Sequence, residues 1–354
     1  MLFLRLFVVY QKNKEGREKQ LSLVLVILAL LIIRSSTPFY ENNIDYLSVY
    51  QTRTINGIAT ILIFLSHATQ YLTWGGVQDE IFLSFRDVAS QLVVVPFMGF
   101  SGYGIMKCLL AGRKKYLESY LKRRVGKTWI MFAGAVTLYI MINLMLGNHY
   151  TYLDYLGAFT AWVNIGNSNW YIFSILFLYL AVYIVFKHSY DTRDLLHILM
   201  ITGMCLIYAI ILKCLGKESF WYNTVLVFPA GMFWAYEEKC MTAFIKKKWV
   251  YEGCVVISLL ALGMSLTYVK NIVGFQISSV ACFMLLILIS MKLQLKSQIL
   301  NSIGNYAFEI FIFQRIGFMI SERIFTNRYI FLAVSIIITG IIAKGYRKLL
   351  AKLL

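Results

Sequence analysis

The segment from Ile272 to Met291 reads IVGFQISSVACFMLLILISM, contains no charged residue, and is followed by Lys292 and Lys296. A helix of this length is about 30 Å long, which matches the hydrocarbon core of a bilayer. Lysines directly beyond such a segment are typical of a cytoplasmic end. The segment therefore predicts a transmembrane helix that ends in the cytoplasm.

The rest of the chain repeats this pattern. Of its 354 residues, 59% are hydrophobic and only 14% are charged, a composition typical of a membrane protein. Apolar segments of spanning length lie at 54–73, 89–111, 128–147, 168–187, 195–214, 221–237, 250–268, 272–291, 303–321 and 329–345. Basic blocks follow every second segment, which places both ends of the core in the cytoplasm. The prediction is an all-α, polytopic, multi-pass bundle with a ten-helix core in the cell membrane.

The net charge of +17 does not indicate a nucleic-acid partner. The basic residues lie in short blocks between apolar segments, and the preference of lysine and arginine for cytoplasmic connections explains that arrangement. The expected partner is the lipid bilayer. The six cysteines form no CxxC pair and no cluster with histidine, so we expect no metal site.

The chain divides into an N-terminal part, residues 1–52, and a membrane domain, residues 53–350. Within the first part, the apolar segment 21–39 either spans the membrane, with an external N-terminus, or lies at the interface. We favour a spanning helix. The amphipathic stretch 152–165 is expected at the outer surface, and Trp170 and Tyr171 are aromatic residues that commonly anchor a helix there.

The first core helix carries a polar stripe. At about 100° per residue, Asn56, Thr60, His67 and Gln70 fall on one side, with Arg53 one turn before Asn56. An ionisable residue within a membrane helix usually marks a functional site. From the predicted topology, His67 lies about 20 Å from the cytoplasmic end and is suited to act as a general base. The alternative is a histidine that only packs between helices.

The second core helix contains Pro96-Phe97-Met98-Gly99-Phe100-Ser101-Gly102-Tyr103-Gly104. Proline and glycine break or kink helices and allow close approach of backbones. The segment either opens a pocket beside His67, with Ser101 as a polar lining group, or provides ordinary small-residue packing.

A basic block follows this helix. Seven basic residues lie between 113 and 127 against one acid, and they include Lys122, Arg123 and Arg124. Guanidinium groups bind phosphates with two parallel hydrogen bonds, so the block suits a nucleotide-like donor. Contact with anionic lipid headgroups explains it equally well.

The ninth core helix contains Glu309, followed by Gln314 and Arg315. A buried carboxylate requires a partner, and Arg53, His67 or Arg315 is expected to supply it.

Taken in order, these features resemble the acyltransferase-3 family of integral membrane acyltransferases, from about Arg53 to about Arg347. The resemblance rests on Asn56-x10-His67, Phe97 to Gly102, Lys122-Arg123-Arg124, Asn169-Trp170-Tyr171 and Glu309-Ile310-Phe311-Ile312-Phe313-Gln314. The chain also looks like a Gram-positive branch with an extra N-terminal helix. It departs from the family where Asn56 stands in place of a basic residue and Gln314 in place of a late histidine.

The resemblance implies transfer of an acyl group, commonly acetyl from acetyl-CoA, to a hydroxyl of an extracellular or lipid-linked glycan. His67 would be the base, Arg53 and Asn56 would orient the donor, and the basic block would bind its phosphates. Ser101, Trp170, Tyr171, Glu309 and Gln314 would line the pocket. The alternative is a non-enzymatic membrane protein for export or assembly of surface polysaccharide, which the two departures favour.

Overall fold

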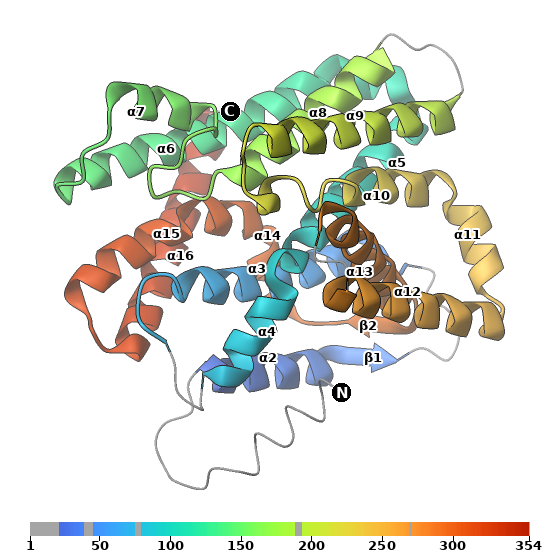
Figure 1. The fold of residues 1–354 in the computed structure, drawn as a ribbon, viewed down its shortest axis with the longest axis horizontal. Helices are drawn as coiled ribbons and strands as arrows, with labels where there is room; N and C mark the ends of the chain where they lie inside the picture. Colours follow the sequence, from blue (N-terminus) through green and yellow to red (C-terminus); the bar gives the residue numbers. More distant parts are fainter. Residues whose placement is uncertain (1–20, 39–44, 75–78, 188–192, 269–270, 354) are drawn as a thin grey trace, which may run out of the picture.

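The computed structural model describes residues 21–38, 45–74, 79–187, 193–268 and 271–353 (Figure 1). The first half contains α2 (Leu21–Ser35), β1 (Ser36–Pro38), α3 (Val49–Ala68), α4 (Glu80–Ala89), η1 (Ser90–Val94), α5 (Val95–Tyr120), η2 (Leu121–Gly126), α6 (Lys127–Met145), α7 (Tyr152–Phe159) and α8 (Trp170–Lys187). The second half contains α9 (Asp194–Cys214), η3 (Ser219–Trp221), α10 (Val227–Tyr236), α11 (Glu238–Ile245), α12 (Lys248–Tyr268), α13 (Ile272–Lys292), β2 (Leu293–Leu295), α14 (Gln298–Asn305), α15 (Ala307–Ile324) and α16 (Arg328–Leu353).

The predicted all-α, polytopic bundle is confirmed. Each of the ten predicted segments coincides with a helix, and the described residues include six helical stretches long and apolar enough to cross a membrane. Two of the core helices, α3 and α15, are not among the six because polar side chains interrupt their apolar sequence. These two helices form much of the candidate site.

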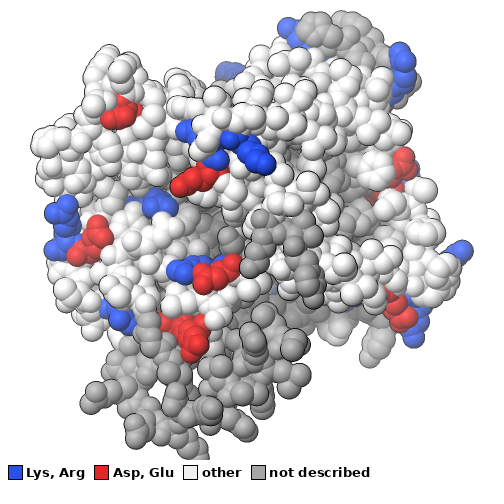
Figure 2. All heavy atoms as spheres, viewed as in Figure 1, with Lys and Arg blue, Asp and Glu red and all other residues white. Residues whose placement is uncertain are grey.

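The surface has the character expected of a protein embedded in lipid. On the face drawn in Figure 2, charged side chains form small, separate groups on a surface that is otherwise neither acidic nor basic. Large apolar side chains project outward along α12 and α16, where Ile257 is 68% exposed and Ile341 67% exposed. Apolar side chains exposed along whole helices are stable only where lipid or protein covers them.

The basic block at 113–127 is helical, although the sequence suggested a loop. The α5 helix continues through the block into η2 and α6, and only at Gly112 does the backbone inside α5 leave the helical conformation (φ 176°, ψ 74°). Lysine and arginine are good helix formers, so the polar block extends the helix rather than ending it. Lys122, Arg123 and Arg124 are held on the π-helical segment η2.

The α2 helix runs antiparallel to α3. Near its start, Val24 and Leu25 pack against the cluster formed by Leu65, close to the end of α3, and Phe82 of α4. Beyond its end, β1 pairs antiparallel with β2, whose backbone also hydrogen-bonds to Gln51 near the start of α3. At 15 residues α2 is shorter than the six stretches long enough to cross a membrane, so the spanning eleventh helix stays a prediction. The predicted position of the N-terminus concerns residues outside the described part of the chain.

Two glycines allow α3 and α14 to touch through their backbones. A Cβ atom at Gly57 would lie 2.0 Å from the carbonyl oxygen of Leu300, and one at Gly304 would lie 1.8 Å from that of Arg53. Only glycine permits such a distance. This contact places Asn56 of α3 beside Asn305 at the end of α14.

The glycines of the second core helix serve packing. A Cβ atom at Gly102 would lie 2.1 Å from the carbonyl oxygen of Phe228 in α10, and one at Gly231 of α10 would lie equally close to that of Gly99. Pro96 stands in the first turn of α5, where proline is tolerated. The expected kink within 96–104 is therefore absent from α5, which is helical from its first turn to Gly112.

Candidate functional site

A large cavity with a basic mouth lies between α3, α5, η2, α8, α15 and α16. We call it the basic cavity, and its volume is about 1560 Å³. Its lining includes Asn56, Thr60, Ile63, Val94, Phe97, Lys122, Arg123, Arg124, Lys127, Tyr171, Tyr179, Asn305, Phe308, Glu309, Phe311, Gln314 and Arg347. The volume exceeds the roughly 300–1,000 Å³ typical of small-molecule sites, so the cavity has room for a long ligand.

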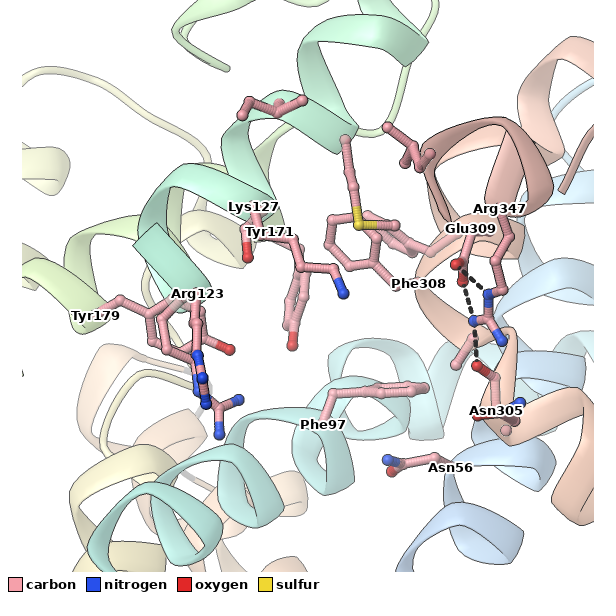
Figure 3. Close-up of a pocket in the computed structure, with 18 of the residues that line it drawn as sticks. Asn56, Phe97, Arg123, Lys127, Tyr171, Tyr179, Asn305, Phe308, Glu309 and Arg347 are labelled. Atoms are coloured by element: carbon pink, nitrogen blue, oxygen red, sulfur yellow. Dashed lines mark hydrogen bonds and ion pairs between the residues drawn. The ribbon is translucent and has the colours of Figure 1, made fainter. Parts of the chain in front are cut away.

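Cations stand at two sides of the basic cavity. Figure 3 shows Arg123 and Arg347 on opposite sides, with Phe97 and Tyr171 between them. The side chains of Lys122 and Arg123 are exposed, whereas Arg124 is partly buried and donates from Nε to the Tyr116 hydroxyl at 3.1 Å. Exposed cations at a cavity mouth can exchange water for phosphate oxygens without breaking protein contacts.

Glu309 has a partner that the sequence analysis did not consider. The Nε and Nη2 atoms of Arg347, on α16, donate to its two carboxylate oxygens at 2.6 Å each, and Nη2 also donates to the carbonyl of Asn305. The prediction that Arg53, His67 or Arg315 pairs with Glu309 was therefore wrong. The glutamate side chain is 3% exposed and that of Arg347 is 32% exposed, so the guanidinium still faces the cavity.

Asn56 lies near this pair with an unused acceptor. Its side chain lines the basic cavity, and its Oδ1 atom is buried with no hydrogen-bond partner among the described residues. A buried polar atom without a partner costs free energy, and such atoms occur most often where a ligand binds. Figure 3 shows Arg347 on the same side of the basic cavity as Asn56.

A second, smaller cavity of about 880 Å³ adjoins the first. We call it the aromatic pocket, and its lining includes Ile63, His67, Gln70, Arg86, Asp87, Val94, Trp162, Asn164, Asn167, Ser168, Asn169, Trp170, Lys217, Glu218, Phe220, Trp221, Phe311 and Arg315. Indole rings combined with amide and guanidinium donors suit a polar ligand that has flat apolar faces, such as a sugar.

Lys217 is held between two of these indoles. Its Nζ atom lies 3.8 Å from the ring centre of Trp162 and 4.4 Å from that of Trp221, and it donates to the Trp162 carbonyl at 3.1 Å. Burial lowers the pKa of the Lys217 ammonium group. The aromatic faces compensate for part of the lost hydration of the cation.

The two cavities meet at His67. Ile63, Val94 and Phe311 line both of them, so the two cavities share a wall at this level. His67 lines the aromatic pocket and Gln314 lines the basic cavity, and His67 Nδ1 lies 2.9 Å from Gln314 Nε2. A group that enters through the basic cavity and one that enters through the aromatic pocket would meet beside this pair.

The Gln314 amide determines which ring nitrogen of His67 carries the hydrogen. With Nε2 toward the ring, the amide donates to Nδ1 and, at 3.3 Å, to the Phe311 carbonyl, while its own Oε1 has no partner among the described residues. With the amide turned over, Oε1 accepts from Nδ1–H, and the lone pair of His67 Nε2 becomes free. The second arrangement is the one in which His67 is a base.

The predicted residues are thus distributed over both cavities. Asn56, Lys122, Arg123, Arg124, Tyr171, Glu309 and Gln314 line the basic cavity, while His67 and Trp170 line the aromatic pocket. Arg53 is exposed and lines neither cavity. Ser101 also lines neither, and its hydroxyl is hydrogen-bonded at 3.0 Å to Tyr179, which does line the basic cavity.

The structure adds basic residues that were not predicted to belong to the site, among them Arg347, Arg315 and Lys217. Arg347 drew attention in the sequence only as part of a block that orients the last helix, and Arg315 only as a partner for Glu309. Lys217 gave no signal, because a single lysine in a connection between helices is common. Contacts between segments far apart in the chain bring all three to the cavities.

The comparisons with known proteins concern the family of the chain. A family model described as an acyltransferase domain matches residues 54–344, which is most of the chain. No curated protein and no solved structure matches. The matched region begins within α3 and ends within α16, so it includes the residues that line the two cavities except Arg347, Leu350 and Ala351.

Proposed function

The chain belongs to the acyltransferase-3 family of multi-pass membrane acyltransferases, and from this premise we propose that it is an O-acetyltransferase of the cell membrane. It moves an acetyl group from cytoplasmic acetyl-CoA to a hydroxyl of an extracytoplasmic or lipid-linked glycan. The observation that carries the proposal is the junction of the two cavities beside His67. A donor and an acceptor on opposite sides of a membrane require such a junction.

The donor occupies the basic cavity. Lys122, Arg123 and Arg124 bind its phosphates at the mouth, on the side that the basic blocks assign to the cytoplasm. The acyl-bearing end of the donor then extends between Phe97 and Tyr171 toward the junction (Figure 3). Asn56 and Arg347 contact the donor on the opposite wall, so Arg347 provides the cation that we first assigned to Arg53.

The acceptor occupies the aromatic pocket, where its hydroxyl faces His67. The Nε2 atom of His67 removes the hydroxyl proton as the oxygen attacks the thioester carbon. The carbon–sulfur bond then breaks, and the leaving thiolate takes the proton back from the imidazolium. With its amide turned over from the orientation in the structure, Gln314 accepts from Nδ1–H through Oε1 and keeps the ring oriented, which the glutamine can do without exchanging a proton itself.

The direct test uses the purified protein in lipid nanodiscs with acetyl-CoA labelled in the acetyl group. We expect label in an added envelope glycan together with an equal amount of free CoA thiol. Nanodiscs expose both faces, so donor and acceptor can be added together. Donor binding without any transfer to glycan would overturn the proposal and favour a role in polysaccharide export or assembly.

Neutralising the cavity mouth should weaken donor binding. For Arg123→Gln combined with Arg124→Gln, we expect the Kd for acetyl-CoA to rise roughly 10- to 100-fold, because charge-assisted hydrogen bonds to phosphate are lost. The difference should shrink at high salt. Calorimetry on the purified variants measures both quantities.

The matched control replaces Lys114 and Lys115, two exposed cations of the same basic block that do not line the cavity. This control removes two positive charges from the basic block, as the test variant does, so both variants change the preference of the block for the cytoplasm equally. Equal weakening in both double variants would assign the effect to overall charge rather than to a phosphate site.

Removing the Gln314 amide should slow transfer without weakening donor binding. For Gln314→Leu we expect kcat to fall roughly tenfold to a hundredfold, because the imidazole loses the acceptor that fixes its tautomer. Gln314→Glu retains an acceptor and should keep more activity than the leucine variant. Equal loss in both variants would show that Gln314 acts by packing alone.

A further inference from the structure

Arg315 is a cation of the aromatic pocket that has only neutral partners. Its Nε atom donates to the Ser168 hydroxyl at 2.9 Å and its Nη2 atom to the Gln70 side-chain carbonyl at 2.7 Å. The hydroxyl of Tyr71 is a further polar neighbour. Among the residues that the structure describes, no carboxylate lies within ion-pair distance of Arg315.

The other charges of this pocket are already balanced. Asp87 accepts from Arg86 Nε at 3.0 Å and from Nη2 at 2.7 Å. Glu218 is exposed beside Lys217 and acts on that cation electrostatically. The pocket thus has three cations against two carboxylates, and Arg315 is the cation left over.

Arg315 places this excess positive charge close to the proposed base, His67. It follows Gln314 directly in α15, and both it and His67 line the aromatic pocket. A partly buried guanidinium has lost part of its hydration, and an anion compensates for this loss better than a hydroxyl or an amide does. The fork of donors also matches the oxygens of a carboxylate or a phosphate.

We propose that the acceptor glycan is acidic, and that Arg315 binds a carboxylate or phosphate group near the hydroxyl that receives the acetyl group. This inference rests on the proposed function and names its acceptor class. A uronic acid and a sugar phosphate both present anionic oxygens to the guanidinium, so the experiment has to distinguish between them. Arg315 is accordingly a specificity-determining residue rather than a base.

The test compares three matched sets of oligosaccharides as acceptors for the purified protein: a neutral glucan, one with uronate carboxylates and one with sugar phosphates. We expect kcat/KM to be roughly 10- to 100-fold higher for at least one acidic set than for the neutral set. Arg315→Gln should reduce this acidic-to-neutral ratio to near one, and Arg315→Lys should retain part of it. Whichever acidic set is preferred identifies the anionic group.

The control is Arg323→Gln, which removes an exposed arginine of the same helix that does not line the pocket. It should leave the ratio unchanged. Preference for the neutral glucan, or equal loss on all three acceptors in Arg315→Gln, would overturn the inference and leave the proposed acetyl transfer intact. Failure of the wild-type protein to acetylate any of the three sets would instead count against the proposed function.

Discussion

His67→Ala is expected to lower acetyl transfer by about 10²- to 10⁴-fold, the range that a general base contributes. His67→Gln should lose a similar factor, because an amide has no lone pair basic enough to accept the hydroxyl proton. Donor affinity should stay close to that of the wild type, since His67 lines the aromatic pocket and not the basic cavity. Labelled acetyl incorporation into glycan and calorimetric binding of acetyl-CoA measure the two properties separately.

The matched control is His149→Ala, which removes an exposed histidine that lines neither cavity. In cells, we expect the His67 variants to export glycan at the normal rate with its acetyl groups missing. Normally acetylated glycan from those variants would rule out His67 as the base. Loss of export together with normal in vitro transfer would favour the non-enzymatic role that the two departures from the family pattern suggested.

The sequence was a good guide to features that depend on one segment at a time. Apolar length and the position of lysines and arginines located the core helices, since each helix must span the same thickness of lipid. The polar stripe on α3 followed from helical periodicity. In the structure its members Asn56 and Thr60 line one cavity while His67 and Gln70 line the next.

Which helices contact one another could not be predicted from the sequence. Arg347 meets Glu309 across 38 positions, and Gln314 meets His67 across 247. Periodicity tells which side of a helix is polar, but not which other helix that side meets. For this reason the stripe alone points to Arg53, one turn from Asn56, as the donor-side cation, while α16 brings Arg347 to the cavity from the far end of the domain.

The departure at Gln314 shows a related limit. A glutamine in place of a histidine removes an acid or base, and from the sequence this weakens the case for catalysis. In the structure the Nε2 atom of this amide lies 2.9 Å from Nδ1 of His67, and with the amide turned over its Oε1 atom becomes the hydrogen-bond acceptor that an imidazole base needs there. Glutamine in place of histidine at position 314 therefore removes a proton-transfer group but can still orient the His67 ring.

Arg347→Gln is expected to produce the second large effect, on stability and on donor binding together. It leaves the carboxylate of Glu309, which is 3% exposed, without a counter-charge, and breaking a buried ion pair in this way costs about 3 kcal/mol or more. Glu309→Gln should cost less, because the Arg347 side chain, which is 32% exposed, can still reach water and ligand. The thermal unfolding temperature in detergent should therefore be lower for Arg347→Gln than for Glu309→Gln.

Donor binding separates the two roles of this pair. If Arg347 contacts the donor, Glu309→Gln should retain the affinity for acetyl-CoA, because it releases the guanidinium from its carboxylate. The double variant with Glu309→Gln and Arg347→Gln removes both charges, so it should regain most of the lost stability while still binding the donor weakly. A double variant that regains stability and binds acetyl-CoA as the wild type does would make the pair purely structural. The cation that replaces the one missing at Asn56 would then have to be sought among Lys122, Arg123 and Arg124 at the mouth.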